Sequence, residues 1–197
     1  MALVLSSAPT TEPITVQEVK DHSRISVSAD DATIQRYIKF ARTQLENALG
    51  SAFVTQTWTL YLDTFPASEF LLPRAPLQSV TSIKYTDEDS NQSAVSSDDY
   101  LVDSDSKPGR VTLKSGKAWP ATTLQENNAI EIIFVAGYGA RSAVPEPIRQ
   151  ALLLMVADAH EYRESVLVEP GLTRIDMGNP IHLVQNYNMK TRGRALT

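Results

Sequence analysis

The sequence predicts an α+β fold that is mainly helical, with an antiparallel β insertion and an extended carboxyl-terminal arm. Two segments carry apolar residues at steps of three and four, which indicates amphipathic helices. Between them, apolar residues alternate with polar ones, which indicates half-buried strands. After residue 165 neither period continues and glycine and proline recur, which is typical of an arm rather than of a core element.

Two helices are expected near the amino end. Residues 15–18 and 28–31 both have the form of a capping box, in which a hydroxyl and a carboxylate satisfy free backbone groups at a helix start. The first helix should span about residues 16–23. The second, about residues 30–49, carries a clear apolar stripe, and Gly50 can supply its left-handed C-terminal cap.

The β insertion should span about residues 55–136. Its clearest strand places Trp58, Leu60 and Leu62 in alternation with the residues between them. Further short strands are expected at residues 70–72, 80–85, 100–102, 110–113 and 130–135. Stretches rich in Asp, Ser, Asn, Pro and Gly separate them, and spacing this short favours antiparallel hairpins over parallel βαβ units.

A third helix should follow the β insertion, at about residues 146–163. Pro145 and Pro147 stand where the first turn of a helix tolerates proline, and apolar residues then recur with helical spacing as far as Ala159. The expected organisation is an amino-terminal tail, one folded domain and an arm. Their bounds are residues 1–13, 14–165 and 166–197.

The composition excludes several kinds of site. The chain has no cysteine, which removes disulfides, thiolate zinc sites and cysteine nucleophiles. Its net charge of -5 argues against binding nucleic acid through a broad basic surface. No run approaches the ~18 apolar residues that cross a bilayer, so we expect a soluble protein with no membrane partner.

Two loops are similar to ligand-binding motifs, but each lacks defining residues. Residues 87–98 open like a calcium loop, yet Gln92 replaces the turn glycine and the bidentate glutamate is absent, so a β-turn is favoured. Residues 137–139, Gly-Tyr-Gly, lie where a phosphate-binding loop would, but Ser142 stands in place of the third glycine and no lysine follows. We interpret this loop as a strand exit beside an exposed tyrosine.

Catalytic and metal-binding patterns are also weak. The histidines, His22, His160 and His182, are far apart and show no metal-ligand spacing. Sequence order alone leaves a Ser-His-Asp site open, but no Gly-x-Ser-x-Gly elbow supports one. We therefore expect no catalytic residue, no metal and no cofactor.

Several short segments, taken in order, resemble those of one family. The amino-terminal group comprises Ile14-Thr15, Glu18-Val19-Lys20, His22, Arg24-Ile25, Asp30-Asp31, Ala41-Arg42, Leu45-Glu46, Gly50 and Thr55-Gln56-Thr57-Trp58. The later group comprises Phe134 to Gly139, Val144-Pro145, Ile148, Ala151-Leu152-Leu153 and Tyr162-Arg163-Glu164. With these segments, most of residues 13–165 resembles the tailed-phage head–tail connector, or adaptor, family. The sequence departs from the expected Asp-Gly hairpin turn at Asp89-Ser90-Asn91.

The resemblance implies a structural virion protein rather than an enzyme. Its fold would be a small helical bundle with a β insertion, and its copies would form a ring, commonly of twelve, under the portal protein at the capsid vertex. The ring would extend the DNA channel without sequence-specific binding and would provide the platform for the stopper or tail. The protein would be made in the host cytoplasm and would reside in the virion neck, the head–tail junction.

Two surfaces are candidates for contacts in such a ring. Acidic residues crowd the middle of the β insertion and could line the channel or meet a basic face of the next ring, although a solvated hairpin tip is the plainer interpretation. They are Asp87, Glu88, Asp89, Asp98 and Asp99. The third helix and the arm could contact the portal or another subunit through Leu152, Met155, Tyr162, Arg163, Ile181, Leu183, Tyr187, Arg192 and Arg194.

Two alternatives remain. Another virion completion protein, such as a stopper or tail terminator, fits less well because two long helices around a β insertion differ from a mostly β barrel. A small hydrolase or ligand-binding enzyme would need a convergent polar cluster that the sequence does not show.

Overall fold

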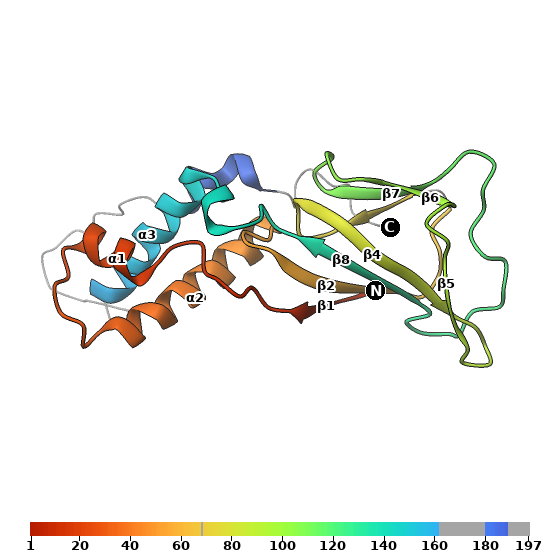
Figure 1. The fold of residues 1–197 in the computed structure, drawn as a ribbon, viewed down its shortest axis with the longest axis horizontal. Helices are drawn as coiled ribbons and strands as arrows, with labels where there is room; N and C mark the ends of the chain where they lie inside the picture. The colour runs from red at the N-terminus through yellow and green to blue at the C-terminus, as the bar shows by residue number, and fades with distance from the viewer. Residues whose placement is uncertain (68, 162–179, 189–197) are drawn as a thin grey trace, which may run out of the picture.

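A computed structural model describes residues 1–67, 69–161 and 180–188. Within these residues the helices are α1 (Val16–Ser23), α2 (Asp31–Leu49), α3 (Glu146–Glu161) and the 3-10 helices η1 (Arg141–Ala143) and η2 (Pro180–Tyr187). The strands are β1 (Ala2–Ser7), β2 (Gln56–Leu62), β3 (Glu69–Leu72), β4 (Leu77–Thr86), β5 (Gln92–Ala94), β6 (Tyr100–Asp103), β7 (Gly109–Leu113) and β8 (Ile130–Ala136). The molecule is elongated, with the helices at one end and the strands at the other (Figure 1).

The helical part is built around the apolar stripe of α2. Ile34, Ile38 and Leu45 are at most 2% exposed and pack with residues of α1, α3 and η2 in one core. The predicted bounds of α1 and α2 agree closely with the structure, and Gly50 caps α2 with a φ of 66°. Tertiary burial of this stripe, more than helix propensity, stabilises α2.

The two predicted capping boxes have different outcomes. The Thr15 hydroxyl accepts a hydrogen bond from the Glu18 amide at 3.0 Å, and the Glu18 carboxylate accepts one from the Thr15 amide at 2.6 Å, so the first box is confirmed. The second is wrong, because α2 begins after Asp30 and no side-chain hydrogen bond caps it. The chain leads into α2 through a turn in which the Asp31 amide donates a hydrogen bond to the Ser28 carbonyl.

The β part consists of two antiparallel sheets with their own core. One has the strand order β1-β2-β8-β4-β5 and the other β3-β7-β6. Trp58, Leu60, Ile132 and Phe134 of the larger sheet are buried in one cluster with Phe70 and Val111 of the smaller sheet. The sheets approach closely at Gly109, where a Cβ atom would lie 2.5 Å from the Leu77 Cβ, so only glycine fits there.

The expectation of a mainly α fold with a β insertion is wrong. Of the residues that the structure describes, 31% are helical and 30% are in strands, and the sheets enclose a core that is separate from the helical one. Two strands, β1 and β5, were not anticipated. The expected tail, residues 1–13, contains β1, which pairs with β2 along its length.

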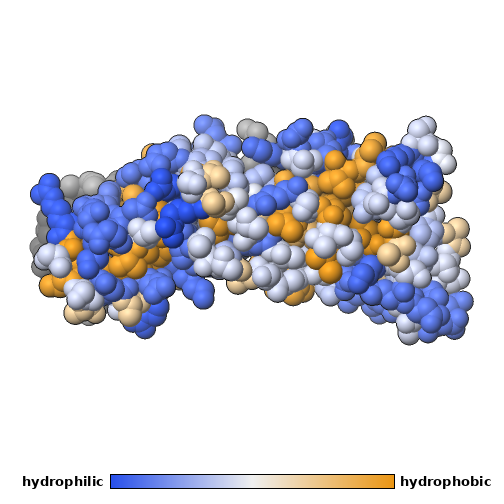
Figure 2. Space-filling model, viewed as in Figure 1, coloured by the Kyte–Doolittle hydropathy of each residue, from blue (hydrophilic) through white to orange (hydrophobic). Residues whose placement is uncertain are grey.

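The surface reflects this division. On the face in Figure 2, apolar residues gather over the middle of the β part, and hydrophilic residues cover its end farthest from the helices. Within the described residues, no helix combines the length and the apolar character that crossing a membrane requires.

Candidate functional site

A buried polar network joins the helical part to the β part. Glu46 on α2 is 4% exposed and accepts hydrogen bonds from the Phe53 amide at 2.8 Å and the Gln56 side-chain amide at 2.6 Å. Arg42, one turn earlier, donates to Glu46 at 2.8 Å and to Glu12 at 2.6 Å. Burial raises the pKa of Glu46, although these donors and the Arg42 charge oppose the shift. The network therefore ties α2 to the segment between β1 and α1, through Glu12, and to the segment that leads into β2, through Phe53 and Gln56.

Further contacts reinforce this junction. Arg74 donates to the Glu46 carbonyl at 3.3 Å and lies 4.6 Å from the centre of the Trp58 ring, a cation–π contact. Arg141 donates to the Glu12 carbonyl at 2.8 Å. No sequence pattern predicted this network. Its available signal was a charged pair, residues 42 and 46, placed four apart beside the apolar stripe of α2.

The Gly-Tyr-Gly loop is the strand exit that we predicted, but its tyrosine is not exposed. Gly137 and Gly139 have φ values of 122° and 116°, and both permit the turn from β8 toward η1. The Tyr138 ring packs against the helical core, and burial raises its pKa to about 12. The loop therefore anchors the β part to the helices.

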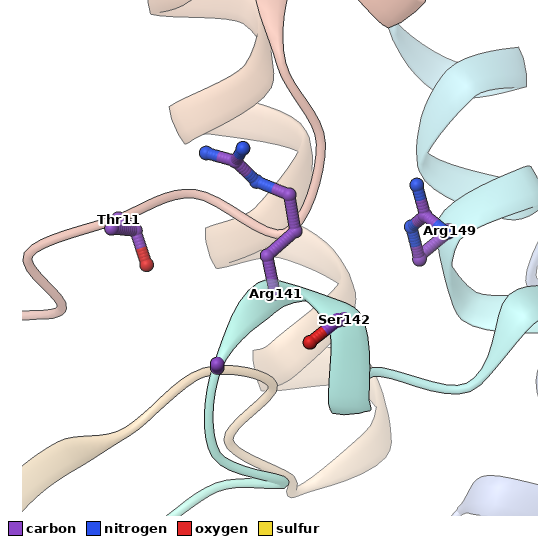
Figure 3. A pocket seen from close by; sticks show the side chains of 5 residues that line it. Thr11, Arg141, Ser142 and Arg149 are labelled. Atoms are coloured by element: carbon purple, nitrogen blue, oxygen red, sulfur yellow. The ribbon is translucent and has the colours of Figure 1, made fainter.

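A shallow depression opens beside the junction (Figure 3). It is lined by Thr11, Ala140, Arg141, Ser142 and Arg149. Arg149 is already paired with Glu18 and, at 2.9 Å, with Glu146. The Arg141 side chain extends toward Thr11 and away from Arg149 (Figure 3). The lining offers hydroxyls and cations but no general base, so it does not form a hydrolase site.

Metal ligands do not converge in the described part of the chain. No group of three His, Asp or Glu side chains there could hold an ion. Asp87, the first residue of the calcium-like loop, instead accepts backbone hydrogen bonds from Asp89 at 3.0 Å and Asn91 at 2.8 Å. These bonds lower its pKa, and the β-turn interpretation is confirmed.

The acidic candidates lie at the end of the β part that is farthest from the helices. The turn between β4 and β5 lies at this end in Figure 1. It holds Asp87, Glu88 and Asp89, of which the last two are exposed. Asp98 and Asp99 precede β6, and Asp99 forms an ion pair with Lys117 at 2.7 Å. Two short loops thus present most of this charge to the outside.

The interface candidates are divided between core and surface. Leu152 is fully buried in the helical core and cannot contact another chain in this arrangement, while Met155 and Tyr187 pack against the same core. Leu183 on η2 is 54% exposed, whereas the next residue, Val184, is buried. The residue Ile181 also belongs to η2. Tyr162, Arg163, Arg192 and Arg194 lie outside the described residues.

Most of the chain matches one known protein family. Residues 12–169 match the family described as HCP, head completion protein. The chain belongs to the head completion protein family. No curated protein matches it. The resemblance to head–tail connector proteins is thereby confirmed, and with it a structural role in the virion at the head–tail junction.

Chains in three solved structures share the fold of this protein. A chain in the neck of an empty gene transfer agent (GTA) particle, computed with C6 symmetry, is 24% identical, with a TM-score of 0.79. A chain in the virion of a native GTA particle is 22% identical, also with a TM-score of 0.79. A chain in the neck of a native GTA particle, computed with C12 symmetry, is 24% identical, with a TM-score of 0.75. Each match covers 95% of both chains, so the whole subunit fold is shared.

Proposed function

We propose that this head completion protein assembles into a ring under the portal of a phage-like particle, where it extends the DNA channel and provides the attachment platform for the stopper or tail. The observation that carries the proposal is the match over 95% of the chain to subunits of GTA necks computed with C6 and C12 symmetry. We propose twelve copies per ring, the number that the C12 symmetry implies.

The two-part architecture suits a ring subunit. A cyclic ring joins each copy to the next through two different faces, so a subunit needs distinct surfaces on its two sides. The junction network around Glu46 and Arg42 fixes the helical part relative to the β part, which lets one end bind a partner while the other contacts the next component. A rigid subunit of this kind holds its portal-facing end and its tail-facing end in a fixed arrangement.

The charge suits a passage for DNA. A channel that must let DNA slide should make few phosphate contacts, because each Lys or Arg that neutralises a phosphate strengthens binding. The net charge of -5 and the acidic turn at the end of the β part agree with this requirement. We assign no enzymatic activity to the chain, in keeping with its membership of a family of structural virion proteins.

Electron microscopy of the purified protein, alone and mixed with portal-bearing capsids that lack a neck, tests the proposal. We expect rings, or added density at the portal vertex, and restored attachment of tails. A protein that stays monomeric and leaves the capsid vertex unchanged in the presence of portal would contradict the proposal.

A further inference from the structure

Within the described residues, two strands leave their backbone hydrogen-bonding groups open at the borders of the two sheets. β1 is the outermost strand of the five-stranded sheet, and β6 is the outermost strand of the three-stranded sheet. Within the described residues, β1 pairs with β2 alone and β6 with β7 alone. An open edge is a template for pairing with another chain, which monomeric proteins normally protect.

Both open edges carry exposed apolar side chains. On β1, Val4 is 48% and Leu5 is 41% exposed; on β6, Leu101 is 54% and Val102 is 39% exposed. The β1 strand contains no charged side chain and no proline, the residues that commonly block edge pairing. These two edges therefore combine free backbone groups with apolar surface.

The remaining edges differ from these two. β5 has only three residues, Gln-Ser-Ala, and β3 begins with the exposed Glu69. Short or charged edges are the usual protection against pairing. The single charge on β6 is Asp103, which is already bound by Ser106 at 2.6 Å and by Arg110 at 2.8 Å within its own hairpin. A strand laid along β6 would therefore meet little unpaired charge.

We propose that β1 of one copy adds to the edge of β6 of the next copy, so that the two sheets become continuous from subunit to subunit around the ring. The inference rests on the proposed ring function and names the contact that would build it. Pairing of β1 with another β1 would give a closed pair, whereas pairing of two different edges repeats head to tail. In Figure 1 the two strands lie on different sides of the β part, as such a repeat requires.

Lysine at the exposed position of each edge tests the pairing. Val4→Lys and Leu101→Lys place a charge on one edge each, and neither residue is buried, so both variants should unfold at the same temperature as the unchanged protein. We expect each variant alone to lose ring formation, on its own and on portal-bearing capsids. Val27→Lys is the matched control, since Val27 is also 54% exposed but lies in the loop between α1 and α2, and it should form rings.

Mixing the two variants gives the decisive measurement. Val4→Lys retains an intact β6 edge and Leu101→Lys an intact β1 edge, so together they can form one good contact and no more. We expect the mixture to form dimers in analytical ultracentrifugation, while each variant alone stays monomeric.

Each other outcome overturns the inference. If the unchanged protein forms no ring with or without portal, the proposed function fails too. If it forms rings and either edge variant still does so, the ring function stands and the β1–β6 pairing is wrong. The same holds if the mixture gives no dimer, or if Val27→Lys abolishes rings as completely as the edge variants do.

Discussion

Gly137 and Gly139 lie in one turn and have similar positive φ values, 122° and 116°, yet they differ in the space around them. A Cβ atom on Gly137 would lie 2.6 Å from the Val54 carbonyl carbon, whereas one on Gly139 would lie 3.7 Å from the Ala143 Cβ. Both alanine variants carry backbone strain, but only Gly137→Ala also forces two backbone segments apart. We expect it to lower the free energy of unfolding by about 1–3 kcal/mol more than Gly139→Ala does. Urea denaturation of both variants measures this difference, and equal losses would refute the close approach.

Asp103 gives the β6–β7 hairpin a dependence on pH. Hydrogen bonds from Ser106 and Arg110 lower its pKa from 3.8 to about 2. A lowered pKa in the folded state means that the stabilisation is fully present above the ordinary value and is lost as the pH falls through the folded one. Between pH 3.8 and about 2, Asp103→Asn should therefore lose less stability than the unchanged protein.

Thermal unfolding across that pH range checks this expectation. Asp105→Asn is the control, because Asp105 is an exposed neighbour whose side chain forms no ion pair with the described residues. A control that flattens the pH dependence as much as Asp103→Asn would show that the hairpin contacts are not the cause.

The two capping boxes that the sequence predicts differ in the side-chain hydrogen bonds that they form at the starts of α1 and α2. Thr15 and Glu18 exchange hydrogen bonds at the start of α1, whereas Ser28 is exposed and makes no such side-chain contact to α2. Thr15→Ala should lower the free energy of unfolding by about 0.5–2 kcal/mol, and Ser28→Ala by less than about 0.5 kcal/mol. Chemical denaturation of both variants measures the pair. A larger loss for Ser28→Ala would mean that α2 is capped differently in solution.

Local patterns explain which elements could be predicted. The stripe of α2 and the alternation in β2 depend on residues that are close in sequence, and both were predicted near their observed bounds. β1 could not be, because a short apolar run becomes a strand only when a partner accepts it, and its partner β2 lies more than 50 positions along the chain, as in the pair Leu3 and Leu60. The second capping box failed for a related reason, since tertiary packing decides where a helix starts.

In the whole molecule, the size of the β part was underestimated from the sequence, because the burial of its strands depends on how the two sheets assemble. Each strand is short, yet together they enclose a core as complete as that of the helices. The junction at the candidate site is a second example: Arg42 and Glu46 stand beside the apolar stripe of α2 in the sequence, and only the approach of Phe53 and Gln56 makes them part of a buried network. Sequence patterns predict a helix face, but not which segments meet it.

The acidic turn supplies the last prediction, because its position at the end of the β part places its charge far from the helices. Glu88→Lys with Asp89→Lys reverses two exposed charges and spares Asp87, whose carboxylate holds the turn. Like charges brought together cost several kcal/mol, so if this surface meets a basic face of the next neck component, its attachment should fall by at least about tenfold. Rings should still form.

Counting tailed particles after complementation with each variant measures this loss. Asp21→Lys with Asp158→Lys is the matched control, because it changes the net charge by the same amount at exposed positions on α1 and α3. Normal attachment by the turn variant, or an equal loss from the control, would contradict a contact between the acidic turn and the next ring. A loss confined to the turn variant would place the tail-facing end of the subunit in the β part and leave the helical end for the portal.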